Sequence, residues 1–539
     1  MKSVKSFFPA FAWLLTGLFA VTIVWLNFHC ALWYDHDIFP DAYLGRLMFE
    51  QKTLFPSNWV FGNRFFILGT PVLAAFYYAV FQDTVLSMAA ASSTMMVLVL
   101  FVFIWALYPK IGKKGIAAGT LCMIGGIILG VRASTFKAGL QVLYTMSSYY
   151  ACYLVVILFT MGVFLRLREL GKVSWWQWVL CVLLNFAVGI HSIREMLLLN
   201  IPLVLVEGLD LVRRMRKENY RDVFFAERFK ILFAGLMFVV NLAGVLVSHW
   251  IPAQVTPAID PGINLEGAVL WSQFLESSRN LVEIMGLLFP ARGLKCYPLF
   301  GAALVIVSVV FYSLWLILKY KDTGFLATFI KYCGISVFGV WFAGVFIIHT
   351  RPLYFFVYYL LATLCILYLL RRSEEKGLYG WLYAAVLAIG TISYVSHFLP
   401  DYLDYRKNDA KARAVAREIV EKGDVDCIFD VYDHPIIAAY SKDRIVSCKV
   451  NVDYTRANGY LFSANPSLIT NEMRDDAYFG RELISLGRSQ YEHILERAPA
   501  EYLDEFRESL VLEREDTIGD NTYMLFRPVR RVVGPQVLQ

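Results

Sequence analysis

The stretch FFPAFAWLLTGLFAVTIVWLNFHCA, residues 7–31, decides the fold class of this 539-residue chain. It contains no Asp, Glu, Lys or Arg, and it exceeds the ~18 apolar residues that cross a hydrocarbon core of ~30 Å. It is also longer than the apolar region of a cleaved signal peptide, roughly 7–15 residues, and lacks a clear small-residue cleavage site. We interpret it as a retained membrane helix preceded by Lys2 and Lys5.

Similar apolar runs recur along the first 400 residues. The chain is 58% hydrophobic and has a mean hydropathy of +0.54, whereas globular chains are nearer half apolar. The short alternating segments of a membrane barrel are absent. The sequence therefore predicts an all-α polytopic membrane domain of about eleven transmembrane helices, followed by a C-terminal soluble α/β domain. The predicted spans are 7–31, 84–108, 115–131, 142–165, 174–190, 195–212, 231–250, 297–318, 325–348, 352–370 and 378–399.

The net charge of +6 conceals a difference between two regions. Residues 1–400 contain 31 Lys and Arg against 19 Asp and Glu, a balance of +12, and residues 401–539 contain 19 against 25, a balance of −6. We therefore predict a basic transmembrane domain, 1–400, and an acidic soluble domain, 401–539. The positive-inside rule explains the basic excess, so no nucleic-acid partner is expected.

A twelfth apolar segment, 65–81, determines the topology, because it is short and contains Gly69 and Pro71. If it does not cross, the main basic clusters share one side with the N-terminus, as the positive-inside rule requires. We expect a cytoplasmic N-terminus and an interfacial or re-entrant helix at 65–81. The loops 32–83 and 251–296 and the tail, residues 401–539, are expected to be extracytoplasmic. The basic clusters are 109–114, 166–172, 213–230, 319–321 and 371–376.

The tail combines helix and strand patterns. We predict helix in DYLDYRKNDAKARAVAREIVEKG (401–423), strand in CIFDVYD (427–433), further helix around 481–511, and a last strand in TYMLFRP (522–528). Cys427 and Cys448 are interpreted either as a disulfide or as two free thiols, because spacing alone does not determine which cysteines pair. The group Asp430, Asp433 and His434 is interpreted as a strand-end turn, with a metal site as the alternative.

Three acidic side chains follow the first span in YDHDIFPDAYLG, residues 34–45: Asp35, Asp37 and Asp41. Asp37 and Asp41 share one face if a helix begins there, and Pro40 suits a first helical turn. The carboxylates either stabilise a helix N-terminus through its dipole, or one of them is a general base that deprotonates an acceptor hydroxyl or amine. Asp35 and Asp37 are the residues expected to hold Mg²⁺ or Mn²⁺ if a metal is used, although the sequence requires none.

The longer run DHDIFPDAYLGRLMFEQKTLFPSNWVFGN, residues 35–63, resembles the first extracytoplasmic loop of the glycosyltransferase C (GT-C) superfamily, which includes protein O-mannosyltransferases and aminoarabinose transferases. In that family an Asp opens a juxtamembrane helix, a second acidic residue follows, and a segment of the form fP…W.YG comes later. Asp37 matches the first position and Asp41 lies near the second. The family's adjacent Asp–Glu pair is absent here, so the resemblance leaves the base open between Asp35, Asp37 and Asp41, and we favour Asp37.

Cationic side chains lie at other predicted extracytoplasmic turns. NFAVGIHSIREMLLLNIP, 185–202, contains His191, Arg194 and Glu195. Arginine suits bidentate binding of phosphate, so Arg194 is predicted to bind a donor phosphate, with His191 lining the cavity. The alternative is an interfacial polar turn in which Arg194 pairs with Glu195 or Asp41.

Two further cationic sites follow the same reasoning. HTRPLYFFVYYLL, 349–361, resembles a GT-C segment that places a basic residue near the lipid-linked phosphate, which implies Arg351; an interfacial anchor is the alternative. Arg132 and Lys137 follow the third span and are also phosphate candidates. Residues 265–286 are predicted to form an amphipathic surface helix.

The resemblance implies a membrane glycosyltransferase that transfers a sugar from a polyprenyl-phosphate donor to an extracytoplasmic glycan, lipid or protein, with inversion. The expected partners are that donor, its acceptor and membrane lipids. The alternatives are a polytopic transporter or flippase, which would have interrupted helices and charges near the bilayer midplane, and a non-catalytic scaffold of the same architecture. The sequence contains no P-loop, zinc-protease or nucleophile-elbow motif.

Overall fold

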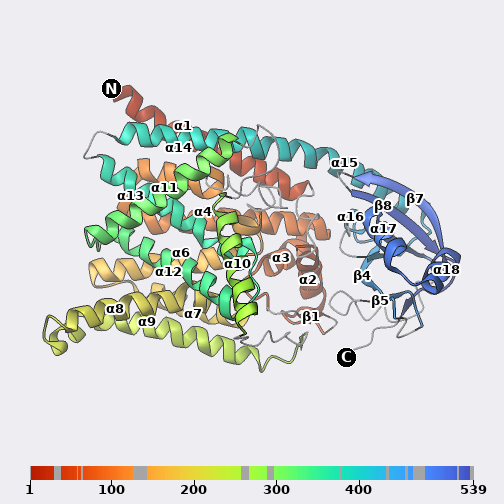
Figure 1. Cartoon of the computed structure of the whole chain (residues 1–539), viewed down its shortest axis with the longest axis horizontal. Helices are drawn as coiled ribbons and strands as arrows, with labels where there is room; N and C mark the ends of the chain where they lie inside the picture. The colour runs from red at the N-terminus through yellow and green to blue at the C-terminus, as the bar shows by residue number, and fades with distance from the viewer. Residues whose placement is uncertain are drawn as a thin grey trace.

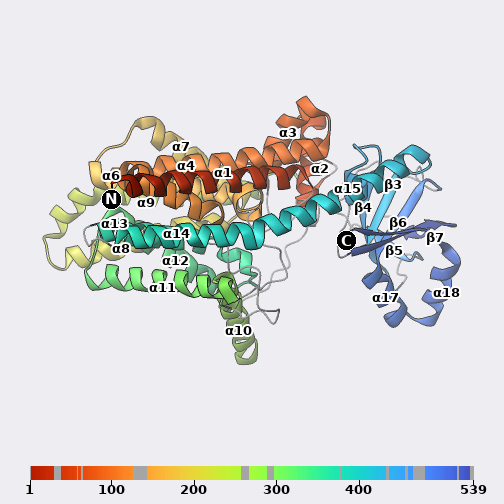
Figure 2. The same cartoon turned by 90° about the horizontal axis from the view of Figure 1, so that it is seen from above.

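A helical bundle and a smaller α/β domain make up the computed structural model, and the α/β domain lies beyond one end of the bundle (Figure 1). The start of α1 lies at the other end, as the turned view also shows (Figure 2). We call the end next to the α/β domain the domain end, and the other the basic end. The structure describes residues 2–29, 38–57, 59–61, 65–126, 143–255, 266–287, 297–374, 378–431, 436–455, 459–464, 480–518 and 521–534.

Long apolar helices form the bundle. Among the described residues, eight helices are long and apolar enough to cross a membrane, which confirms a polytopic helical membrane domain. The main helices are α1 (Lys2–Phe28), α4 (Thr84–Leu121), α6 (Ala151–Leu170), α7 (Trp175–His191), α8 (Ile201–Met215), α9 (Tyr220–Ser248), α11 (Tyr297–Lys319), α12 (Phe325–Phe346), α13 (Val357–Glu374) and α14 (Tyr379–Ser393). Shorter turns extend or connect them: η2 (Cys122–Gly126), η4 (Leu143–Ser147), η5 (Met196–Asn200), η7 (Pro352–Phe355) and η8 (Tyr394–Phe398).

Gly112 divides α4 into two helical segments. Its φ of 64° and ψ of 179° lie in a region that is essentially restricted to glycine. A Cβ on Gly119 would lie 3.1 Å from the ring of Phe103, although a straight helix would separate these residues by about 24 Å. The chain therefore reverses at Gly112, and α4 with η2 accounts for both predicted spans 84–108 and 115–131. Each of the eleven predicted segments contains a helix, and the number that cross the membrane stays a prediction.

Glycines allow α7 and α9 to pack with their backbones in contact. A Cβ on Gly189 would lie 2.2 Å from the carbonyl oxygen of Asn241, and one on Gly244 would lie 2.3 Å from the carbonyl oxygen of Phe186. Small residues serve this purpose in membrane bundles, where close packing stabilises helix association. The end of α7, which carries His191, is therefore held firmly against α9.

The predicted basic clusters do meet at one end of the bundle. Lys110 forms an ion pair with Glu169, and Arg168 forms one of 2.7 Å with Glu207. Arg372 donates a 2.9 Å hydrogen bond to the hydroxyl of Tyr368, which itself donates one of 2.9 Å to Asp322. The turn between α8 and α9, within the basic cluster 213–230, lies at the end remote from the α/β domain (Figure 1). This grouping agrees with the charge argument, while the side of the membrane that it faces stays a prediction.

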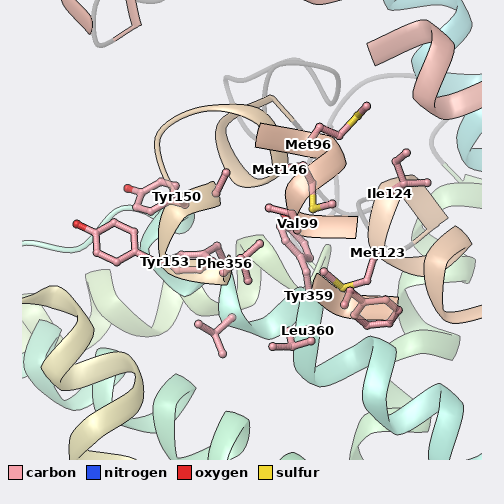
Figure 3. Packing of buried hydrophobic residues seen from close by; sticks show 14 of the residues in the cluster. Met96, Val99, Met123, Ile124, Met146, Tyr150, Tyr153, Phe356, Tyr359 and Leu360 are labelled. Carbon is pink, nitrogen blue, oxygen red and sulfur yellow. The ribbon is translucent and has the colours of Figure 1, made fainter. Parts of the chain in front are cut away.

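The core of the bundle is close-packed beneath the domain end. Figure 3 shows part of it, with Met96, Val99 and Met146 on one side and Tyr150 and Tyr153 on the other. The ring of Tyr150 stacks on Phe356 at a centroid distance of 4.8 Å. These contacts join α4, η4, α6 and α13, so the aromatic residues near the domain end are held by several helices at once.

Short elements cover the domain end. Two helices and two short parallel strands form most of this layer, with Val60 paired to Gln254 and Phe61 to Val255. The helix in the predicted segment 65–81 has 12 residues and would rise only about 18 Å, which is less than the ~30 Å membrane core. The elements are α2 (Ile38–Gln51), β1 (Val60–Phe61), α3 (Thr70–Phe81), β2 (Gln254–Val255) and α10 (Gly267–Ile284), the last of which confirms the helix expected within 265–286.

The α/β domain is a mixed sheet with helices on both faces. From α14, the chain continues without interruption through η8 into α15, Leu399–Lys422. The strand order is β7-β8-β6-β3-β4-β5-β9, with β3 parallel to both β4 and β6. One face packs against α15 and α16 (Ile436–Ala439), and the other against α17 (Arg488–Arg497) and α18 (Ala500–Ser509). The strands are β3 (Cys427–Val431), β4 (Val446–Val452), β5 (Phe462–Ala464), β6 (Glu482–Gly487), β7 (Leu510–Ile518), β8 (Asn521–Pro528) and β9 (Val533–Gly534).

The helix predicted at 481–511 is wrong at its beginning. Residues Glu482–Gly487 form β6, a strand in the middle of the sheet, and helix begins only at Arg488. The run ELISLG is buried along nearly its whole length, so it lacks the alternation of a half-buried strand. A short apolar run of this kind has the same sequence pattern in a buried strand and in a buried helix.

Cys427 and Cys448 are both free thiols in the structure, and both are buried. They lie on neighbouring strands, but Cys427 is aligned with Val446 and Cys448 with Phe429. The register therefore offsets the two cysteines along the sheet. The disulfide reading is not supported, and the cysteines pack as small apolar side chains.

Candidate active site at the domain end of the bundle

Asp41 lies in the first turn of α2, as the helix-start pattern predicts. Its side chain is buried, and the positive end of the helix dipole favours a carboxylate at this position. Asp35 and Asp37 precede α2 and lie outside the described residues, as do Arg132 and Lys137. The choice among the three carboxylates as base stays a prediction.

A cluster of apolar side chains packs α2 against the end of α7. Leu44, one turn after Asp41, belongs to this cluster together with Phe61 and Phe65, and Ile190 packs against it. Gly45 allows α3 to approach, since a Cβ there would lie 2.8 Å from the Cβ of Ala74. The acidic start of α2 and the 191–195 turn are therefore built on one packing unit.

His191 and its neighbours form the second part of the site. The carbonyl oxygen of His191 accepts a 2.9 Å hydrogen bond from the backbone N–H of Phe65. Its ring lies edge-on to Tyr153 at 5.4 Å and to Phe66 at 5.9 Å. His191 therefore packs against Phe65, Phe66 and Tyr153, and its predicted role in lining a cavity stays a prediction.

Arg194 lies among tyrosines. Its guanidinium is 5.2 Å from the ring centroid of Tyr354 and 5.6 Å from that of Tyr149, and it donates a 3.4 Å hydrogen bond to the Tyr149 hydroxyl. No carboxylate of the described residues forms an ion pair with it, and the carboxylate of Glu195 has no hydrogen-bond partner there. The reading in which Arg194 pairs with Glu195 or Asp41 is therefore wrong.

Arg351 lies three residues before Tyr354 in the chain. The backbone N–H of Tyr354 donates a 2.9 Å hydrogen bond to the carbonyl oxygen of Arg351, whose side chain is exposed. The preceding residue, Thr350, accepts a 2.7 Å hydrogen bond at its carbonyl oxygen from the side chain of Asn280 on α10. The backbone of Arg351 is thus joined to Tyr354, whose ring contacts Arg194.

Sequence reasoning missed the aromatic residues of the site. Tyr149, Tyr150 and Tyr153 occur in the run SSYYACY, where clustered tyrosines indicate no more than an interfacial position. The structure places Tyr150 and Tyr153 beside Phe356 (Figure 3), and Tyr149 next to Arg194. A cation held over aromatic rings stays charged and pre-oriented without a carboxylate partner, which leaves it available to an anionic ligand.

The predicted metal sites remain without structural support. No group of three or more His, Cys, Asp and Glu side chains gathers in the described part of the chain. Asp433 and His434 lie outside it, and Asp430 accepts a 2.8 Å hydrogen bond from the Ser447 hydroxyl on the neighbouring strand. Asp430 therefore has a structural role in the sheet, and the Mg²⁺ or Mn²⁺ site at Asp35 and Asp37 stays a prediction.

Comparison with known proteins identifies the architecture. No protein-family model matches the chain, and no curated protein matches it in sequence. Solved structures of ArnT from Cupriavidus metallidurans do match: the form bound to undecaprenyl phosphate has a TM-score of 0.51 at 14% identity, and the apo form has 0.50 at 12%. Each alignment covers 96% of this chain and 99% of ArnT.

This chain shares the fold of ArnT. The match extends over both the helical bundle and the α/β domain, because nearly the full length of each chain is aligned. Within this fold, α2, which carries Asp41, packs against the end of α7, which carries His191, and Arg194 contacts Tyr354.

Proposed function

We propose that the chain is an integral membrane glycosyltransferase that uses a polyprenyl-phosphate-linked sugar. The observation that carries the proposal is Arg194, a cation without a carboxylate partner among the described residues, which contacts Tyr149 and Tyr354. The similar structure of ArnT contains undecaprenyl phosphate, a ligand whose phosphate is suited to such a cation.

The proposed reaction is one direct displacement at the sugar. A carboxylate, Asp37 with Asp35 and Asp41 as alternatives, accepts the proton of an acceptor hydroxyl or amine. The freed electron pair bonds to the anomeric carbon, the carbon–oxygen bond to the donor phosphate breaks, and its electrons remain on the departing polyprenyl phosphate. Backside attack inverts the anomeric configuration.

Arg194 and Arg351 supply the electrostatic part of this mechanism. Negative charge grows on the phosphate as the sugar leaves, so pre-oriented cations stabilise the transition state more than the ground state. His191 lines the site beside Tyr153. The acceptor is a glycan, lipid or protein at the extracytoplasmic surface, where lipid-linked donors replace nucleotide sugars.

Native mass spectrometry of the purified protein tests the donor. We expect added polyprenyl phosphate to form a one-to-one complex, and polyprenol of the same length, which lacks the phosphate, to bind at least tenfold more weakly. Equal retention of both lipids would overturn the assignment of a phosphate site. Release of free polyprenyl phosphate only when donor and acceptor are combined would distinguish transfer from the alternatives of a flippase and a scaffold.

A further inference from the structure

The α/β domain contacts the helix that carries Asp41. Asp443 lies in the turn between α16 and β4, and its carboxylate is 3.6 Å from the guanidinium of Arg46 on α2. Both side chains are largely buried, with 15% and 23% exposed respectively. Arg46 follows Asp41 by about 7.5 Å along the helix axis.

The same carboxylate contacts two more helices of the bundle. It accepts a 3.2 Å hydrogen bond from the backbone N–H of Thr84, at the start of α4, and one of 3.3 Å from the hydroxyl of Tyr78 on α3. Asp83 already caps α4 through a 2.9 Å bond from the N–H of Leu86. Asp443 therefore acts as a second cap, supplied by the other domain, and joins α2, α3 and α4 at one point.

The turn that presents Asp443 is shaped for this contact. Lys442 and Asp443 have φ values of 56° and 60°, a left-handed conformation that costs energy for residues other than glycine. The hydroxyl of Ser441 secures the turn, because it accepts a 2.9 Å bond from the N–H of Ile445 and donates one of 2.7 Å to the carbonyl oxygen of Ala438.

The α/β domain also contacts the end of α1. Arg413 on α15 donates a 3.1 Å hydrogen bond to the carbonyl oxygen of Phe28, the last residue of α1. It also pairs with Asp409 at 3.0 Å, which in turn accepts a hydrogen bond from Tyr440. The α/β domain therefore contacts the last residue of α1 through Arg413 and the middle of α2 through Asp443.

We propose that Asp443 and Arg413 are positioning residues, through which the α/β domain holds α1 and α2, the helix that carries Asp41, in place for catalysis. This inference rests on the proposed function, since Asp41 is one of its candidate bases. The domain contributes no reacting group through these two residues. It acts by fixing the positions of α1 and α2 relative to each other.

The test uses the full-length protein in lipid nanodiscs and two kinds of measurement. Asp443→Asn keeps an oxygen acceptor and tolerates the left-handed backbone, but removes the charge opposite Arg46. Arg413→Gln removes the second contact. Asp426→Asn is the matched control, because it removes a carboxylate whose 2.9 Å partner, Arg481, belongs to the same domain.

Hydrogen–deuterium exchange decides whether α2 is held. We expect amides of 38–51 to exchange about tenfold faster in the Asp443→Asn and Arg413→Gln double variant, with no change in α12 or α13 and none in the control. Unchanged exchange in α2 would overturn the inference. This measurement needs no substrate, so its outcome does not depend on whether the proposed transferase function is correct.

Kinetics decide whether that holding serves catalysis. We expect kcat to fall about 10- to 100-fold, as a misplaced catalytic group predicts, while binding of polyprenyl phosphate stays within twofold. Faster exchange in α2 with an unchanged kcat would also overturn the inference. If the unmodified protein does not bind polyprenyl phosphate, that result would instead contradict the proposed function.

Discussion

The hydroxyl of Tyr149 lies 3.4 Å from the guanidinium of Arg194, a cation that has no carboxylate partner in the described part of the chain. Arginine without an anionic partner at a membrane surface is costly unless aromatic rings or a ligand compensate it. Tyr149 and Tyr354 supply the first form of compensation. A donor phosphate would supply the second.

Arg194→Lys should reduce kcat by about 100- to 1000-fold, the usual cost of losing one oriented donor to a developing anion. Lysine keeps the charge but cannot form the two parallel hydrogen bonds of a guanidinium. The measurement is single-turnover transfer, with Arg221→Lys, an exposed arginine beyond α8, as the control. A kcat within threefold of the parent value would remove Arg194 from the site.

Asp37→Asn should abolish transfer and leave binding of the donor intact, because the amide cannot accept the acceptor's proton. Asp41→Asn should reduce the rate less if Asp41 mainly stabilises the start of α2. Transfer and donor binding are measured separately for each variant. Near-normal turnover of Asp37→Asn would move the role of base to Asp35 or Asp41.

The orientation of the chain can be measured with single cysteines on exposed residues of the two ends. Glu508→Cys lies on α18 of the α/β domain, and Lys217→Cys lies beyond α8 at the basic end. In intact cells an impermeant thiol reagent should label only Glu508→Cys, with the parent chain as the blank. Labelling of Lys217→Cys before lysis, and of Glu508→Cys only after it, would reverse the topology.

Gly244→Ala should destabilise the bundle by about 1–3 kcal/mol, a typical cost of overpacking. The added methyl would lie 2.3 Å from the carbonyl oxygen of Phe186, so α7 and α9 would have to separate. Gly235→Ala on the same helix is the control, since its Cβ would contact nothing within 4 Å. Thermal unfolding in detergent should show a lower Tm only for Gly244→Ala, and equal Tm values would refute the close-packing role.

The stability of the α/β domain should fall as pH rises through about 7 because of Glu482. Burial in β6 raises the pKa of this carboxyl from 4.5 to about 7, so the folded state holds its proton more tightly than the unfolded chain does. The stabilisation is complete below the unfolded pKa and is lost as pH rises through the folded one.

Glu482→Gln, which cannot ionise, should therefore be more stable than the parent at pH 8 by about 1–2 kcal/mol after allowance for solvent screening. At pH 4 the two chains should be nearly equal. Hydrogen exchange of the sheet amides at both pH values measures the difference, with Glu508→Gln on exposed α18 as the control. A constant difference at both pH values would exclude titration of Glu482 as the cause.

The parts of the fold that depend on long-range composition were predictable from sequence. Apolar length located a helix in each of the eleven predicted segments, and the positive-inside rule grouped the basic loops, because both signals sum over many residues. β6 was not predictable, since ELISLG is buried on both faces and carries no strand period. Its neighbours in the sheet come from distant parts of the chain.

The charged candidates for the site could be named from the sequence, whereas their aromatic contacts could not. Arg194 and His191 were recognisable because ionisable side chains are rare near membrane spans. Tyr149 and Tyr354 lie far apart in the sequence, and only the packing of the bundle brings both rings to one guanidinium. Arg194 does not pair with the adjacent Glu195 because of the geometry of the turn, and the local sequence does not determine that geometry.

The uninterrupted passage from α14 through η8 into α15 has a practical consequence for imaging. Helices of 15, 5 and 24 residues follow one another, and α15 alone rises about 36 Å. The continuous helix thus carries the sheet, and Asp443 and Arg413 hold the α/β domain against the bundle. In electron cryomicroscopy, it would project from the detergent micelle as a built-in fiducial marker, so that particles could be aligned without an antibody fragment.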